Sequence, residues 1–157
     1  MIGWRESRKP TGAVSAETSS EAFMADTALE QHMAMVGRVI AKFVSDGLLL
    51  HDIDSRGAEK FLGTDEDGKI FAAVLVWMLD EGIIRAKKVT PMISGGVIHL
   101  SAAQLTAKGL AIVKQPLPDG GTIEKRIQSD AGGSSSWSSI GELVGGFAGG
   151  FTKAVSS

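Results

Sequence analysis

The stretch that decides the fold is "IHLSAAQLTAKGLAIV", residues 98–113. Its beginning belongs to "GVIHL" (96–100), a short apolar run that favours a β-strand. The residues that follow have helical spacing, and Ser101 supplies a hydroxyl that can cap a helix N-terminus. We therefore expect a strand that passes directly into a helix. That helix would carry an apolar set formed by Leu105, Ala107, Leu110, Ala111 and Val113.

The residues before this stretch predict a hairpin and a long helix. The segment "IIRAKKV" (83–89) is a second strand, joined to the first by the loop "TPMISGG" (90–96). Upstream, residues 64–82 contain Thr64 and Asp67 at capping-box spacing, and the segment ends at a glycine. Its apolar residues lie on every side, which is typical of a helix packed on more than one side. We expect this helix to be buried.

Three more elements are expected nearer the N-terminus. Residues 21–46 form a helix that starts after Ser20, and "LLLHDID" (48–54) is a short strand. Residues 55–63 form two helical turns capped by Ser55. The first of these helices has an apolar stripe at steps of four and three, made of Leu29, Met33, Val36, Ile40 and Val44.

This order of elements resembles the winged-helix variant of the helix-turn-helix fold. The resemblance is carried by "VLVWMLDEGIIR" (74–85), a third helix running into the first wing strand, and by 98–113. Within the latter, Leu105-Thr106-x-Lys108-Gly109 is a phrase common in bacterial winged-helix proteins. The resemblance covers roughly residues 25–115. It implies an α+β, mainly helical, winged-helix-like fold with a C-terminal extension.

Winged helices are best known for binding DNA, and the chemistry of the third helix bears on this activity. Reading base edges needs Arg, Lys, Asn or Gln on the exposed face. This helix offers Lys69 and is otherwise mainly apolar, and the carboxylates of "TDED" (64–67) would repel phosphate. Four cations remain as candidate nucleic-acid contacts: Arg85, Lys87, Lys88 and Lys108. They would hold phosphate by charge alone, so we expect any DNA binding to be weak and non-specific; the alternative is that they are ordinary solvated side chains.

Catalytic and metal-binding patterns are not found in the sequence. The chain has no cysteine, which excludes disulfides and Cys-ligated zinc. The segment "GTDEDGK" (63–69) resembles part of a calcium loop, but its first and twelfth positions are Gly63 and Val74, which offer no side-chain oxygen. The three histidines, His32, His51 and His99, have no metal-ligand spacing. We expect no enzyme activity, no cofactor and no metal.

Composition indicates a globular protein with an unusual C-terminal segment. Apolar residues make up 43% of the 157-residue chain, charged residues 22%, and the net charge is −2. No stretch has the length of a membrane-spanning helix, and the first residues lack the apolar region of a secretory signal, so a cytoplasmic location is expected. The expected division is a flexible leader (1–20), the winged-helix-like domain (21–127), a Gly/Ser linker (128–139) and a tail (140–157).

The tail combines an apolar helical face with a ladder of glycines. The face consists of Ile140, Leu143, Val144, Phe147, Phe151 and Val155, and the ladder of Gly141, Gly145 and Gly149. Interior glycines each cost a helix roughly 1 kcal/mol relative to alanine, yet they let two helix backbones approach closely. Three alternatives follow: a docked or self-associating helix, a disordered segment, or membrane contact. We predict the first and treat the first five face residues as an interaction surface.

The sequence as a whole favours a protein that acts by binding. We expect a non-catalytic winged-helix module in protein–protein interaction or self-assembly, either a homo-oligomer or an accessory subunit of a larger assembly. The alternative is a DNA-binding regulator that uses the basic wing. A third class, a small membrane-active protein that inserts its tail, is the least expected, because the tail is short and contains Glu142 and Lys153.

Overall fold

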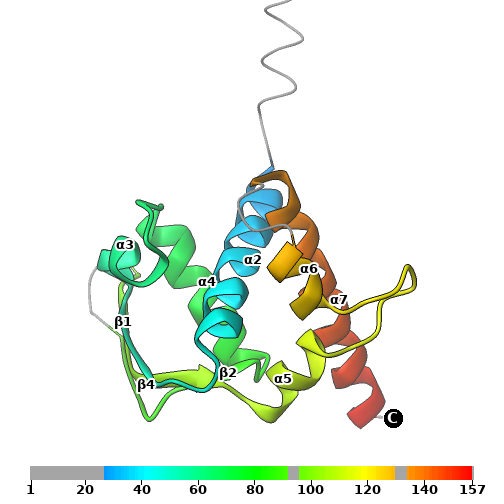
Figure 1. Cartoon of the computed structure of the whole chain (residues 1–157). Coiled ribbons are helices and arrows are strands. Elements are labelled where there is room, and N and C mark those ends of the chain that lie inside the picture. Colours follow the sequence, from blue (N-terminus) through cyan, green and yellow to red (C-terminus); the bar gives the residue numbers. More distant parts are fainter. Residues whose placement is uncertain (1–26, 92–95, 130–133, 157) are drawn as a thin grey trace, which may run out of the picture.

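The computed structural model describes residues 27–91, 96–129 and 134–156 (Figure 1). The chain has an α+β fold in which helices predominate and a small antiparallel sheet lies beside them. The predicted leader (1–20) and residues 21–26 of the first predicted helix lie outside the described residues. The elements are α2 (Ala28–Asp46), β1 (His51–Asp54), η2 (Ser55–Gly57), α3 (Ala58–Leu62), α4 (Gly68–Asp80), β2 (Ile84–Arg85), β3 (Lys88–Pro91), β4 (Ile98–Leu105), α5 (Ala107–Val113), α6 (Ile123–Ser129) and α7 (Ser134–Ser156).

Strand β4 is the centre of the sheet. It pairs antiparallel with β1 on one side, and with β2 and β3 in succession on the other. Ile84 lies opposite Leu105, and Lys88 lies opposite Ser101. The predicted hairpin is therefore present, with the residues between β3 and β4 only partly described. The core-facing side chains of β4 are buried: Ile98, Leu100, Ala103 and Leu105.

The boundary between β4 and α5 differs from the prediction. Residues 101–105 continue the strand, and Thr106, not Ser101, caps the helix by accepting a hydrogen bond from the Gly109 amide at 3.0 Å. The same threonine donates its backbone N–H to the carbonyl of Ile83, at 3.0 Å. A Cβ on Gly109 would lie 2.3 Å from that carbonyl oxygen, so only glycine fits there. The motif Leu105-Thr106-x-Lys108-Gly109 thus joins α5 to the turn after α4.

A β-bulge interrupts the pairing of β4 with β1. His51 pairs with Ala103 and Ile53 with Leu100, so one residue of β1 faces two residues of β4. The extra residue, Ala102, has a φ of 53° and donates its amide to Asp52 Oδ1 at 3.0 Å. The bulge shifts the alternation by one residue, which buries Ala103 and Leu105 in place of Ala102 and Gln104.

Two predicted helix starts and one strand start are also corrected. Helix α2 begins after Thr27, which forms a capping box with Glu30. Helix α4 is capped by Asp67 and not by Thr64, since the carboxylate accepts bonds from the amides of residues 69 and 70. Strand β1 begins at His51, so residues 48–50 of the predicted strand belong to the loop that follows α2.

Helix α4 is buried on one side only, contrary to the prediction of a helix packed all round. Its inward face consists of Phe71, Ala72, Val74, Leu75 and Met78. On the outward side, Val76 is 42% exposed and Ala73 is also exposed. Trp77 is half-buried at the edge of the core. The helix therefore presents apolar side chains to solvent.

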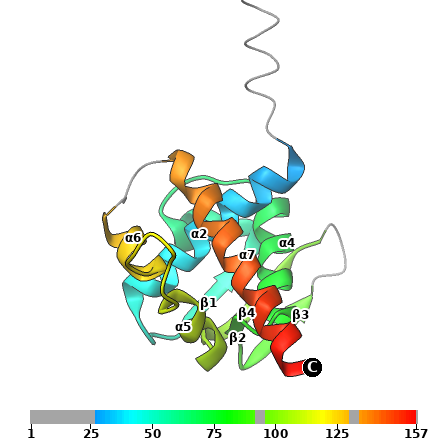
Figure 2. The ribbon, with the colours of Figure 1, turned by 90° about the vertical axis from the view of Figure 1, so that its right-hand side faces the viewer.

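Helix α7 packs along α2, which lies between α7 and the sheet-bearing part of the chain (Figures 1 and 2). It begins at Ser134 and α6 ends at Ser129, so most of the predicted linker (128–139) is helical. Two glycines allow the helices to touch. A Cβ on Gly37 would lie 2.2 Å from the Trp137 carbonyl oxygen, and one on Gly141 would lie 1.9 Å from the Met33 carbonyl oxygen. No helix within the described ranges is long and apolar enough to cross a membrane.

Candidate interaction surfaces

An apolar groove lies between the first half of α2 and the outward side of α4. It has a volume of about 350 Å³. Leu29, His32 and Met33 line it from α2, and Ala73 and Trp77 line it from α4. Leu29 is 68% exposed at its edge, a large value for a leucine in a regular helix. The groove thus combines a hollow with an apolar side chain that projects beside it.

The apolar face of the tail lies inside this chain. Ile140 and Val144 are completely buried, and Leu143 and Phe147 are partly buried against the core. The side chain of Phe151 lies outside the described part of the chain. Of the alternatives predicted for the tail, the structure has the docked helix: α7 packs on α2 of the same molecule. Ile140 and Val144 are not accessible to another molecule in this arrangement.

The four predicted nucleic-acid contacts do not form one patch. Arg85, Lys87 and Lys88 are exposed on β2, on β3 and on the residues between them. The guanidinium of Arg85 donates to Gln104 Oε1 from both Nε (3.1 Å) and Nη2 (2.6 Å). Lys108 instead donates to the Glu81 carbonyl at the end of α4, at 2.7 Å. It therefore belongs to the α4–α5 junction and not to the basic strands.

A second apolar surface was missed by the sequence interpretation. Leu48, Leu49 and Leu50, which follow α2, are 60%, 65% and 61% exposed. Beside them is a hollow of about 340 Å³ lined by Leu50, Ala102, Gln104 and the basic residues Arg85 and Lys87. The run of leucines after Gly47 was the available signal, but a short apolar run is equally typical of a buried strand.

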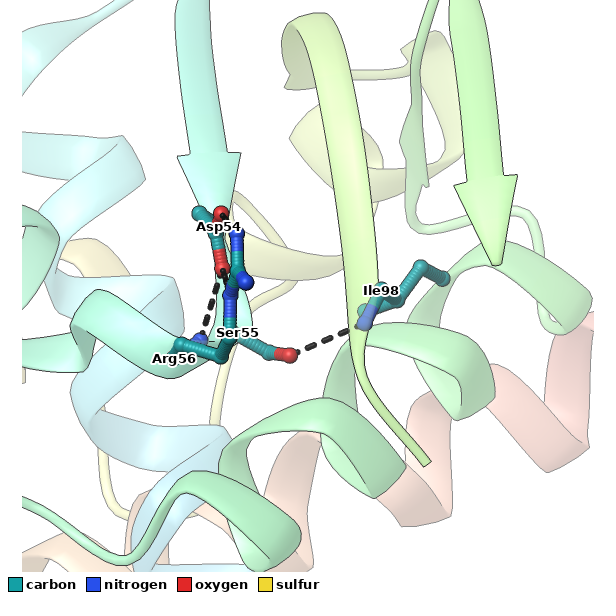
Figure 3. A network of polar contacts seen from close by, with 4 residues as sticks. All are labelled: Asp54, Ser55, Arg56 and Ile98. Atoms are coloured by element: carbon teal, nitrogen blue, oxygen red, sulfur yellow. Dashed lines mark hydrogen bonds and ion pairs between the residues drawn. The ribbon is translucent and has the colours of Figure 1, made fainter. Parts of the chain in front are cut away.

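A polar network fixes the other end of the sheet (Figure 3). Ser55 is 1% exposed, and its hydroxyl accepts a hydrogen bond from the Ile98 amide at 2.9 Å. This bond joins the end of β1 to the start of β4, which explains why Ser55 does not act as the predicted cap. Asp54 takes that role and accepts from Arg56, whose hydrogen bonds lower the pKa of the Asp54 carboxyl to about 2. The carboxylate is therefore ionised at neutral pH.

Comparisons with protein-family models, with curated proteins and with solved structures found no match to this chain. Among the described residues, no three His, Asp or Glu side chains group as metal ligands. His51, which is partly buried, lies edge-on to Phe43 and Phe61 at centroid distances of 5.6 and 5.2 Å. This packing assigns it a structural role.

Proposed function

We propose that this chain is a non-catalytic winged-helix module that assembles with a second copy of itself. The order of α2, β1, α3, α4, the β3–β4 hairpin and α5 supports a winged helix. So does the position of β4 between β1 and the hairpin partners. Helix α4 then corresponds to the helix that DNA-binding members place in the major groove.

The outward face of α4 is the observation that carries the proposal. Its exposed positions are Lys69, Ala73, Val76 and Asp80, which recur at helical spacing. The charges of Lys69 and Asp80 offset each other, and the side chains of Ala73 and Val76 cannot hydrogen-bond to base edges. An apolar face beside an apolar groove is instead typical of a surface that another protein covers.

The groove and its edge are suited to self-association. Leu29 projects beside the hollow that Ala73 and Trp77 line, so the surface has both a protruding and a receiving part. Two copies related by a twofold axis can each place the protruding part in the other's hollow. Leu29 is 68% and Val76 is 42% exposed, so covering each would contribute less than the roughly 1.5–3 kcal/mol of a side chain buried from full exposure. This gain favours a dimer over a solvated groove.

Sedimentation velocity of the full chain over a range of concentrations tests this proposal. We expect dimer formation that is lost in the double variant Leu29→Glu/Val76→Glu, because the introduced carboxylates would be desolvated on assembly. Both residues are exposed, so the variant should keep the circular dichroism spectrum of the parent. The exposed Lys125→Glu in α6 serves as the charge control and should dimerise normally. A parent that remains monomeric at high concentration would refute self-association.

A second candidate function, DNA binding by charge, is favoured by the exposed Arg85, Lys87 and Lys88. Such binding would use phosphate contacts and would ignore sequence. Fluorescence anisotropy with two unrelated duplexes should then give equal, weak affinities that disappear by about 200 mM salt. Tight binding to one duplex, protected in a base-specific footprint, would show that the protein reads DNA and would replace the self-assembly proposal.

A further inference from the structure

The loop after α2 holds three leucines outward on a fixed backbone. Gly47 turns the chain with a φ of 67°, and the carbonyl of Leu48 accepts a hydrogen bond from Gln104 Nε2 at 3.0 Å. Each of Leu48, Leu49 and Leu50 is at least 60% exposed. Because the backbone is anchored, this exposure belongs to the folded loop. Three adjacent exposed leucines leave apolar area in water that burial elsewhere would stabilise.

Cations lie directly beside these leucines. Gln104 connects the two groups, since its amide nitrogen binds Leu48 and its amide oxygen accepts from Arg85. Lys87 is exposed and lines the same hollow as Leu50 and Arg85. The structure therefore places a guanidinium and an ammonium at the edge of an apolar loop.

The nearby carboxylates do not cancel this charge. Asp46 lies 3.0 Å from Lys42 Nζ and 3.2 Å from His51 Nε2, so it is already paired. Asp52 is exposed and its Oδ1 accepts from the Ala102 amide. Against the single negative charge of Asp52 there are three positive charges, on Arg85, Lys87 and the neighbouring exposed Lys88. The surface around the leucines is thus net positive.

We infer that this leucine-loop surface (Leu48, Leu49, Leu50, Arg85 and Lys87) docks on anionic lipid bilayers. The headgroup region of a bilayer offers phosphates just outside an apolar layer, so a bilayer can meet both the cations and the leucines that lie beside them. Consecutive side chains on a loop point in different directions, which a fluid bilayer accepts without the shape complementarity that a protein groove needs. The protein would lie on the surface and not span it.

This inference does not depend on self-association. Leu29 stands in the first turn of α2, whereas the leucine loop follows its last turn, so the two surfaces lie at opposite ends of that helix. Substitutions in one surface can therefore be scored without altering the other.

Vesicle flotation of the full chain tests the inference. We expect binding to vesicles of phosphatidylcholine with phosphatidylglycerol and not to phosphatidylcholine alone. Leu49→Ser/Leu50→Ser should weaken binding by about tenfold or more, since less apolar area enters the bilayer. Lys87→Glu should weaken it further as the attraction to anionic lipid is lost. The charge control Lys125→Glu, exposed in α6 and outside both surfaces, should bind like the parent.

Three results would overturn the inference. The first is absence of binding to the anionic vesicles, and the second is equal binding to both vesicle types. The third is binding that survives the loop substitutions while the circular dichroism spectra remain unchanged. If the loop substitutions alter sedimentation and the parent binds no vesicles, the loop contacts protein and the lipid proposal fails.

Discussion

At position 102 the backbone of β4 adopts a conformation that alanine rarely takes. Its φ of 53° falls in the left-handed region, where an L side chain costs roughly 1–2 kcal/mol. The bulge persists because Asp52 accepts the Ala102 amide and because the one-residue shift buries Ala103 and Leu105. Ala102 also lines the hollow beside the leucine loop, so the strain lies next to a candidate binding surface.

Glycine at this position should therefore stabilise the protein. Ala102→Gly relieves the left-handed strain but adds freedom to the unfolded chain, which leaves a net gain of about 0.5–1 kcal/mol in the free energy of unfolding. Urea denaturation followed by circular dichroism measures it. Ala103→Gly is the matched control, because Ala103 is fully buried and should lose stability. An Ala102→Gly variant that is less stable than the parent would show that no strain is stored there.

At the scale of the elements, the contact between α2 and α7 depends on two glycines. Gly37 and Gly141 each face the backbone of the opposite helix, where a methyl group would overlap a carbonyl oxygen. The rest of the predicted ladder is different. Gly145 would meet only the Met33 sulfur at 3.9 Å, and Gly149 has nothing within 4 Å. Of the three glycines in the predicted ladder, only Gly141 is needed for the close approach of the helices, whereas Gly145 and Gly149 tolerate a side chain.

The same substitution at two rungs of this ladder should have opposite effects. Gly141→Ala forces the helices apart, and overpacking of this kind costs about 1–3 kcal/mol. Gly149→Ala meets no neighbour and should instead gain up to about 1 kcal/mol from helix propensity. Thermal unfolding of the two variants provides the comparison. Equal stability gains in both would contradict the close approach at Gly141.

The predictions of individual elements succeeded where the spacing of apolar residues identified an element. They failed where a single side chain determined a cap or an element boundary. Helix α2 and the β3–β4 hairpin were recognisable from spacing, although Leu29 of the predicted apolar stripe on α2 is 68% exposed. Ser55 and Ser101 both look like caps, but Ser55 instead accepts from Ile98 across the fold. Ser101 lies in a strand whose extension depends on the bulge. Such partners are distant in sequence, so local pattern could not identify them.

At the scale of the whole molecule, the two candidate surfaces consist of the apolar area that the core leaves uncovered. Periodicity predicted that α4 would be apolar all round, which is true of its composition. It could not show that α7 would cover α2 and leave Val76 exposed, because that choice depends on how the helices pack. The leucine loop was hidden for the opposite reason, since an exposed apolar run has the same letters as a buried one.

Helix α7 is expected to be part of the fold and not an appendage, and its removal should show this. A chain that ends at Ser129 loses Ile140, Val144 and Ala148, all completely buried, and uncovers the α2 face that they touch. Burial of the isoleucine and valine alone contributes roughly 3–6 kcal/mol, against a typical total stability of about 5–15 kcal/mol. We expect the shortened chain to lose cooperative thermal unfolding, measured by circular dichroism. A peptide spanning 134–156, added in trans, should restore the transition. If the shortened chain instead unfolds at the same temperature as the parent, α7 does not support the core and its glycine contacts with α2 contribute no stability.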